Sequence, residues 1–250
     1  MLAAALFVVF HTWAIRSSLR WTSGLLGFDA LSSGVLGWLT GLGATTITAA
    51  FRDHPPMLVS FFLLALVATP GLVLLASCDQ LASEIGSRHV RYLLVHTARA
   101  PLYWGKALGA LTFVSLLHAL ATAVAVTIVV LMGAAGAADA VLFGARILAS
   151  LIVFSMPFVA LMALAGALIP YPALGLAAGL GLQFLVWAMS SLGGLVNDSL
   201  RHVRLAYPTA FRFELISDRA GDLAFAFGHI TLLAVVFATA GLLLFRWRDV

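Results

Sequence analysis

Long uncharged apolar runs dominate this chain of 250 residues. The run over residues 30–51 contains no charged side chain and is bounded by Asp29 and Arg52. A helix needs about 20 apolar residues to cross the hydrocarbon core of a bilayer. Helices satisfy their own backbone hydrogen bonds, which is the condition for lying in lipid. Runs of this kind therefore predict membrane-spanning helices.

Six segments are long enough to span, and they cover residues 30–51, 57–78, 107–132, 141–168, 173–194 and 223–245. Composition agrees, because 62% of the residues are hydrophobic and only 10% are charged. Ordinary soluble domains carry about 25% charged residues. The sequence predicts an all-α integral membrane protein in which residues 1–250 form a single transmembrane domain of six helices.

The start of the chain has a different pattern. Its apolar run over residues 2–15 is shorter than a span requires, and Arg16, Arg20 and two tryptophans lie in or after it. Aromatic rings and basic side chains are typical of headgroup depth. We expect residues 1–22 to form an amphipathic helix on the membrane surface. A seventh span stays an alternative, whereas a signal peptide is disfavoured because no basic residue precedes the run.

The distribution of lysine and arginine predicts the orientation of the spans. With the N-terminus in the cytoplasm, the inner side holds Arg16, Arg20, Arg88, Arg91, Arg99, Lys106, Arg246 and Arg248. The external loop over residues 195–222 holds four basic and four acidic side chains, so it has no positive excess. Cytoplasmic loops carry the excess of basic residues. Both termini and the loop over residues 80–104 are therefore predicted to be cytoplasmic.

The cytoplasmic loop over residues 80–104 is itself helix-favouring. Leu81, Ile85, Leu93 and Leu94 alternate with charged side chains at helical spacing. Pro101 is predicted to end this helix before the next span begins. One interpretation is a basic interfacial helix that only sets the orientation. The other is a helix that docks onto a cytoplasmic partner.

The order of residues across this loop resembles a known family. Asp79 and Glu84, the pair Leu93-Leu94, Arg99 and Gly105-Lys106 are similar to the signature of the permease subunits of ABC-2 type transporters. The segment AYPTAFRF over residues 206–213 resembles a segment of the permeases that serve nitrous oxide reductase maturation. Two departures, Gly86-Ser87-Arg88 and His96, fall within the docking surface that the resemblance implies.

The resemblance implies a six-span subunit that exports a substrate across a bacterial inner membrane. Two copies would pair with each other and with two copies of an ATPase subunit, which would hold ATP and magnesium. The chain itself would then be a non-catalytic permease with no cofactor of its own. The residues that the resemblance assigns to ATPase coupling are Asp79, Glu84, Arg88, Arg91, Leu93, Leu94, Arg99 and Lys106.

The residues themselves indicate that any ATPase is a separate chain. The nearest match to a phosphate-binding loop is APLYWGK over residues 100–106. It has Ala100 where the first glycine is needed and Ala107 where a serine or threonine would hold magnesium. A single cysteine, Cys78, and scattered histidines predict no metal site. A net charge of +4 is too small to indicate nucleic acid as a partner.

Two polar residues lie deep in predicted spans. His118 and Gln183 are candidates for a transport pathway, because polar groups within a membrane are costly and often functional. The alternative for each is a hydrogen bond to a neighbouring helix. The apolar interior weakly favours a hydrophobic or amphipathic cargo, while the identity of the substrate stays open.

Glycines four apart in the first and fifth spans suggest close helix contacts, at Gly37, Gly41, Gly175 and Gly179. In ABC-2 exporters the dimer seam runs between these spans, so the resemblance implies that these glycines lie at the seam of a homodimer. Packing within one subunit is the alternative. The external loop over residues 195–222 is predicted to form short amphipathic helices broken at Pro208, which cap the outer mouth, bind a periplasmic partner or pack on lipid.

Two other functions are open on the sequence alone. An ATP-independent transporter would be expected to show inverted repeats and charged groups at mid-membrane depth. A membrane assembly factor would need neither a pathway nor an ATPase.

Overall fold

The computed structural model describes residues 5, 9–13, 50–191, 205–212 and 214–248. In this part of the chain the regular structure is helical and no strand occurs. Five helices are long and apolar enough to cross a membrane, and they cover Pro56–Gly86, Arg99–Leu131, Ala137–Leu168, Pro172–Met189 and Ala220–Trp247. The prediction of an all-α membrane protein is confirmed. The predicted span over residues 30–51 and the predicted interfacial helix over residues 1–22 lie mostly outside the described residues.

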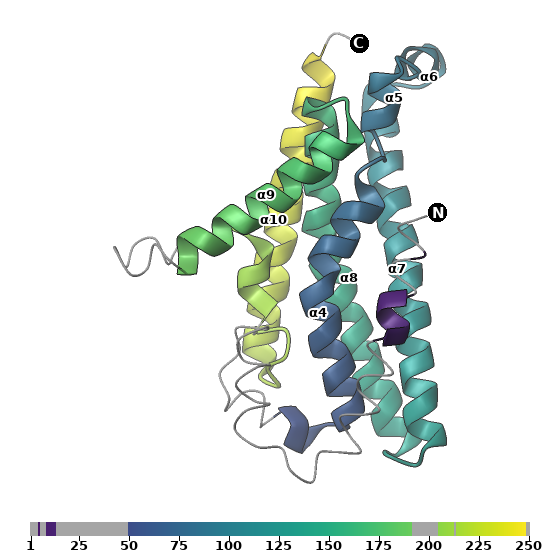
Figure 1. Cartoon of the computed structure of the whole chain (residues 1–250), viewed down its shortest axis with the longest axis vertical. Coiled ribbons are helices and arrows are strands. Elements are labelled where there is room, and N and C mark those ends of the chain that lie inside the picture. The colour runs from purple at the N-terminus through teal and green to yellow at the C-terminus, as the bar shows by residue number, and fades with distance from the viewer. Residues whose placement is uncertain (1–4, 6–8, 14–49, 192–204, 213, 249–250) are drawn as a thin grey trace.

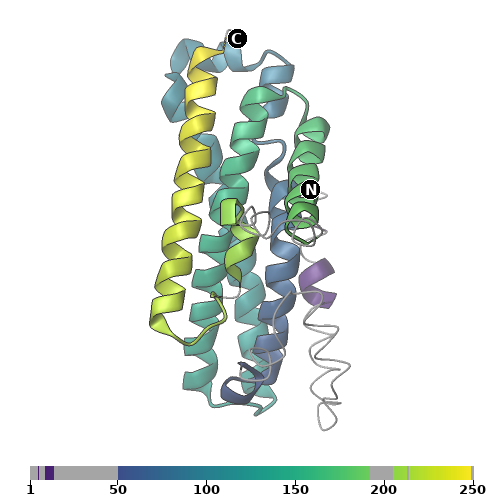
Figure 2. The ribbon, with the colours of Figure 1, turned by 90° about the vertical axis from the view of Figure 1, so that its left-hand side faces the viewer.

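Four long helices run side by side and form the body of the molecule. They are α4 (Pro56–Ser77), α7 (Arg99–Leu131), α8 (Ala137–Leu168) and α10 (Ala220–Trp247). Helix α8 packs against each of the other three, so it is the central helix of the bundle (Figures 1 and 2). Several of its apolar side chains, among them Phe154 and Phe158, are fully buried.

Helix α9 (Pro172–Ser191) departs from this arrangement. It follows the turn at residues 169–171, where Pro170 prevents α8 from continuing, and Pro172 is its first residue. Figure 1 shows α9 leaving the bundle at a slant. Its large side chains, among them Phe184 and Trp187, are exposed in the single chain.

The loop over residues 80–104 forms a separate cap at one end of the bundle. Two short helices, α5 (Ala82–Gly86) and α6 (Val90–His96), replace the single helix that periodicity predicts. The chain turns between them at Arg88, whose φ is 61°, a conformation that ends a helix. Pro101 does not break a helix. It lies in the first turn of α7, where its missing N–H is not needed, and α7 therefore begins at Arg99 instead of residue 107.

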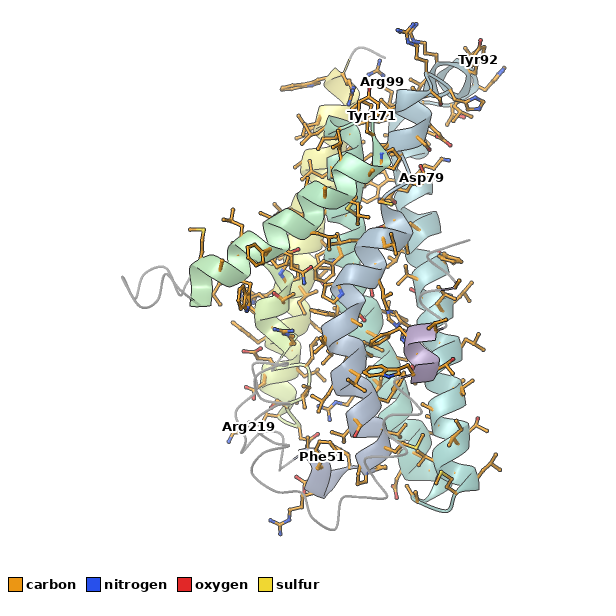
Figure 3. The ribbon with its side chains drawn as sticks, viewed as in Figure 1. Phe51, Asp79, Tyr92, Arg99, Tyr171 and Arg219 are labelled. Carbon is orange, nitrogen blue, oxygen red and sulfur yellow. The ribbon has the colours of Figure 1, made fainter. Side chains whose placement is uncertain are left out.

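The end of the bundle that carries α5 and α6 also carries the turn at residues 169–171 and the end of α10. We call it the α5–α6 end. Asp79, Tyr92, Arg99 and Tyr171 lie there, and Phe51 and Arg219 lie at the opposite end (Figure 3). The predicted cytoplasmic loop and the end of α10 thus share one side of the bundle.

The described part of the predicted external loop, from residue 205 onward, packs into the bundle. A 3-10 helix, η4 (Pro208–Arg212), contacts α8 and α10. Tyr207 and Phe211 are buried, with Tyr207 against Phe158 of α8. Pro208 begins the helix where the sequence predicted a break, because proline fits the first position of a helix.

Candidate functional site at the α5–α6 end

An ion pair ties α5 to the first turns of α7. The carboxylate of Glu84 on α5 accepts a hydrogen bond from the ammonium group of Lys106 on α7. Both side chains are partly screened from solvent, with exposed fractions of 21% for Glu84 and 35% for Lys106. Partial burial weakens screening by water, so this contact is stronger than a pair on an open surface.

Arg99 joins the beginning of α7 to the end of α10. Its guanidinium donates hydrogen bonds of 3.0 Å to the carbonyls of Phe245 and Arg246, and a further bond to the carbonyl of Arg248. The last carbonyls of a helix have no partner within the helix and carry its partial negative charge. Arg99 gives these carbonyls hydrogen-bond donors and places a positive charge beside their partial negative charge. Arg248 in turn donates to the carbonyl of Ala167 near the end of α8.

A small apolar core lies beneath these polar contacts. Tyr103 and Phe245 are fully buried, with ring centroids 6.1 Å apart, and Leu81, Ile85 and Val90 pack in the same cluster. Val90 is the residue of α6 that the sequence analysis missed. Val90 does not fall on the helix face that Leu81 and Ile85 share, because the chain turns at Arg88 and a new helix begins after it.

Two glycines allow α5 to sit close to α8 and to the following turn. A side chain at Gly166 would come within 3.3 Å of the Ala82 nitrogen and the Leu81 Cβ. A side chain at Gly86 would collide with the carbonyl oxygen of Pro170. Gln80 adds a hydrogen bond of 3.0 Å from its amide to the carbonyl of Val159. Nothing in the sequence alone marks these three residues, because their partners are far along the chain.

Helix α6 presents a mixed charged and apolar surface outward. We call it the outer face of α6, and it consists of Arg88, Arg91, Tyr92, Val95 and His96. Tyr92 is 73% exposed and Val95 is 75% exposed. Exposed aromatic and branched side chains beside arginines are typical of protein interfaces. Leu93 and Leu94 are half-buried, and Leu94 packs against the apolar core of this end.

All eight residues predicted to couple to an ATPase lie at this end. Glu84, Arg99 and Lys106 contact other parts of this chain, whereas Asp79, Arg88 and Arg91 are exposed. The cluster is thus divided into a set that anchors α5 and α7 and a set that faces solvent. The role of either set toward an ATPase stays a prediction.

The two candidate pathway residues lie in different surroundings. His118 is buried between α7 and α8, and its Nε2 atom lies 3.2 Å from the Ser155 hydroxyl. Its ring centroid is 5.7 Å from that of His11. The contact between His118 of α7 and Ser155 of α8 is a hydrogen bond between neighbouring helices, which the sequence left as the alternative to a pathway role. Gln183 lies on α9 and lines a cavity with residues of α4 and η4.

The glycines of α9 pack within the subunit. A side chain at Gly175 would lie 3.7 Å from Met162, and one at Gly179 would lie 3.2 Å from Met162 and 3.3 Å from Leu74. Gly175 therefore faces α8, and Gly179 faces both α4 and α8. This is the packing within one subunit that the sequence left as the alternative, and a place of these glycines beside a dimer seam stays a prediction. Small residues let backbones approach in lipid regardless of which chain supplies them. Gly37 and Gly41 lie outside the described residues.

A second polar cluster lies at the opposite end. Arg146 of α8 forms an ion pair with Asp218, and the ring of His54 approaches the same carboxylate at 2.8 Å. The His54 ring also stacks on Phe143, with centroids 4.0 Å apart. Burial alone would raise the pKa of Asp218, but hydrogen bonds from Arg146 and His54 lower it below its ordinary value.

Within the described residues, no group of three or more His, Cys, Asp or Glu side chains could hold a metal ion. Neither a protein-family model nor a curated protein matches the chain. The functional assignment therefore depends on the geometry above and on the sequence resemblance.

Proposed function

We propose that this chain is the permease subunit of an ABC-2 type exporter, with six spans and an N-terminal interfacial helix. The proposal rests mainly on the outer face of α6, which is exposed. The contacts of Glu84 with Lys106 and of Arg99 with the end of α10 hold this end of the bundle together. A separate ATPase binds this face, and its ATP-driven movement reaches the spans through α5 and α7.

The anchoring contacts favour transmission of force. Glu84 and Lys106 connect α5 to α7, and Arg99 connects α7 to the end of α10. A displacement of α5 therefore acts on two long helices at once, and through Gly166 on α8. Packed interiors transmit strain because they have few voids to absorb it.

The charges of the described residues favour a cytoplasmic position for this end. Six basic and two acidic residues lie there, namely Arg88, Arg91, Arg99, Lys106, Arg246 and Arg248 with Asp79 and Glu84. The opposite end holds three basic and five acidic residues, namely Arg52, Arg146 and Arg219 with Asp53, Asp139, Glu214, Asp218 and Asp222. By the positive-inside rule this distribution favours a cytoplasmic position for the α5–α6 end, as expected of a bacterial inner-membrane exporter.

A second copy of the chain completes the transporter. The outward face of α9, which bears Gly181, also carries Leu174 and Leu185, both exposed in the single chain. In a homodimer with two ATPase subunits, this face lies against the partner copy or the lipid between them.

Co-expression with candidate ABC ATPase subunits of the same organism tests the proposal. The complex is purified in neutral detergent, and both co-purification and ATP hydrolysis are measured. The variant Tyr92→Ser/Val95→Ser should lose most of the ATPase while its thermal stability stays unchanged, because neither side chain supports the fold. Leu205→Ser, at an exposed apolar residue outside the α5–α6 end, is the matched control.

Normal binding of the ATPase by the Tyr92→Ser/Val95→Ser variant would contradict the assignment of the docking face. Transport of cargo in vesicles that lack the ATPase would instead favour an ATP-independent transporter.

A further inference from the structure

A half-buried arginine, Arg212, lies in a cavity at membrane depth. The cavity has a volume of about 500 Å³ and lies between α4, α9 and η4. Arg212, the last residue of η4, lines it together with Thr209. The residues of α4 that border it, Val67 to Gly71, lie roughly 16–22 Å along that helix from Pro56, at a rise of about 1.5 Å per residue.

Packing of the residues beside Arg212 fixes it at this depth. Phe211, its neighbour, packs on Phe225 and His229 of α10 with ring centroids 6.2 and 5.2 Å away. Tyr207 anchors the other side of η4 against Phe158, near the middle of α8. Irregular backbone at membrane depth is tolerated where protein buries it or where it lines a cavity. The buried aromatic anchors fix η4, and Arg212 is left facing the cavity.

The positive charge of Arg212 is not compensated within the described part of the chain. No carboxylate there forms an ion pair with it, including Glu214 two residues away, and its Nε atom has no hydrogen-bond partner. An arginine cannot lose its proton to escape the cost of burial. A charge held in this way indicates a site for an anion, which supplies the missing partner.

The remaining walls are amphipathic. Gln183 of α9 adds an amide beside Arg212, whereas Val67 and Gly71 of α4 and Phe184 of α9 are apolar. Trp187, which also lines the cavity, is 53% exposed. The cavity therefore has a cationic part at Arg212 and an apolar part at Phe184 and Trp187, which lies at the depth of lipid chains.

We infer that this cavity binds the anionic head group of an amphiphile, with Arg212 and Gln183 contacting a phosphate or carboxylate. The apolar tail lies along Phe184 and Trp187. Binding itself does not depend on an ATPase, whereas the role of this amphiphile as exported cargo rests on the proposed function. A membrane lipid and a free phosphate share the anionic group, and the measurement below separates them.

The test uses the purified full chain without any ATPase, in dodecyl maltoside. Dissociation constants are measured by native mass spectrometry for dioleoyl phosphatidylglycerol, for dioleoyl phosphatidylcholine and for inorganic phosphate. The wild-type chain should bind the anionic lipid at least tenfold more tightly than the zwitterionic lipid with the same tails. Inorganic phosphate at millimolar concentration should not displace it. Arg212→Gln should abolish the preference, and the control Arg219→Gln, at an exposed arginine of the opposite end, should keep it.

A second variant keeps the charge and fills the space. A side chain added at Gly71 meets nothing within 4 Å, so Gly71→Leu should fold normally and occupy the cavity. It should weaken binding of the anionic lipid at least tenfold, whereas Gly109→Leu, at an equally open glycine of α7, should not. Retained preference in Arg212→Gln, unchanged binding in Gly71→Leu, or displacement of lipid by phosphate alone would each overturn the inference. Because no ATPase is present, failure of the docking experiment leaves these outcomes unchanged.

Discussion

The guanidinium of Arg99 lies 3.0 Å from the carbonyl oxygen of Phe245, a residue 146 positions later in the chain. This contact closes the bundle at the α5–α6 end, because it joins the first residue of α7 to the last turn of α10. It also explains why α10 ends at Trp247 without a glycine cap, since the arginine supplies donors to the open carbonyls.

Removing this arginine should loosen the end of α10. Hydrogen bonds to a charged group contribute about 1.5–3 kcal/mol to stability. We expect Arg99→Ala to lower the free energy of unfolding by about 2 kcal/mol, measured by denaturant titration in detergent. Arg91→Ala removes an exposed arginine of α6 that has no such contacts, and its stability should match the wild type. Equal stability of the two variants would rule out the capping role of Arg99.

The ion pair between Glu84 and Lys106 should matter for coupling more than for binding. Glu84→Gln keeps the size of the side chain but removes the charge that holds α5 on α7. The variant should still bind the ATPase through the outer face of α6, while ATP hydrolysis in its complex no longer drives transport. Asp53→Asn, an exposed acid at the opposite end, is the control and should transport normally. Loss of ATPase binding in Glu84→Gln would show that the carboxylate contacts the partner directly.

Gly241 of α10 allows the close packing of three helices. A side chain there would collide with the hydroxyl of Tyr103 and lie 3.0 Å from the Cα of Leu164. Overpacking of this kind costs about 1–3 kcal/mol. Gly241→Ala should therefore lower the melting temperature of the purified chain. Gly228→Ala, in the same helix but with open space around it, should leave the melting temperature unchanged or raise it slightly.

The cluster of Arg146, His54 and Asp218 should make stability depend on acid. The pKa of Asp218 is lowered in the folded chain, so its contribution is fully present above the ordinary carboxyl pKa of about 3.9. It is lost as pH falls through the lower folded value. Because Asp218 is partly exposed, we expect the effect to be small. Unfolding titrations between pH 5 and pH 2 should show a steeper loss below about pH 3.9 for the wild type than for Asp218→Asn, and parallel curves would contradict this.

The inward position of Gly179 changes where a dimer contact on α9 is expected. Gly181, two residues later, has nothing within 4 Å of an added side chain and lies on the outward face. In a background with Cys78→Ala, Gly181→Cys should form a disulfide-linked dimer on oxidation, seen by non-reducing electrophoresis. Gly179→Cys should stay monomeric, because its side chain packs on Met162. Cross-linking at Gly179 but not at Gly181 would reverse the faces of α9.

The sequence by itself predicted that this is a helical membrane protein and where α4, α8, α9 and α10 run, because length and lack of charge in an apolar run require a spanning helix. It also predicted that the charged residues between α4 and α7 gather at one end. The roles within that cluster came only from the tertiary structure. Glu84 and Arg91 look alike as charged residues of one loop, yet one pairs with Lys106 and the other faces solvent.

The same limit applies to the glycines of α9 and to Arg212. Spacing shows that Gly175 and Gly179 share a helix face, but the neighbour of that face is set by how α9 leans on α4 and α8. Arg212 reads as one of several balanced charges in an external loop, and only the packing of Tyr207 and Phe211 carries it into the bundle. Contacts between residues far apart in the chain depend on how whole helices pack, and local composition and periodicity contain no information about that packing.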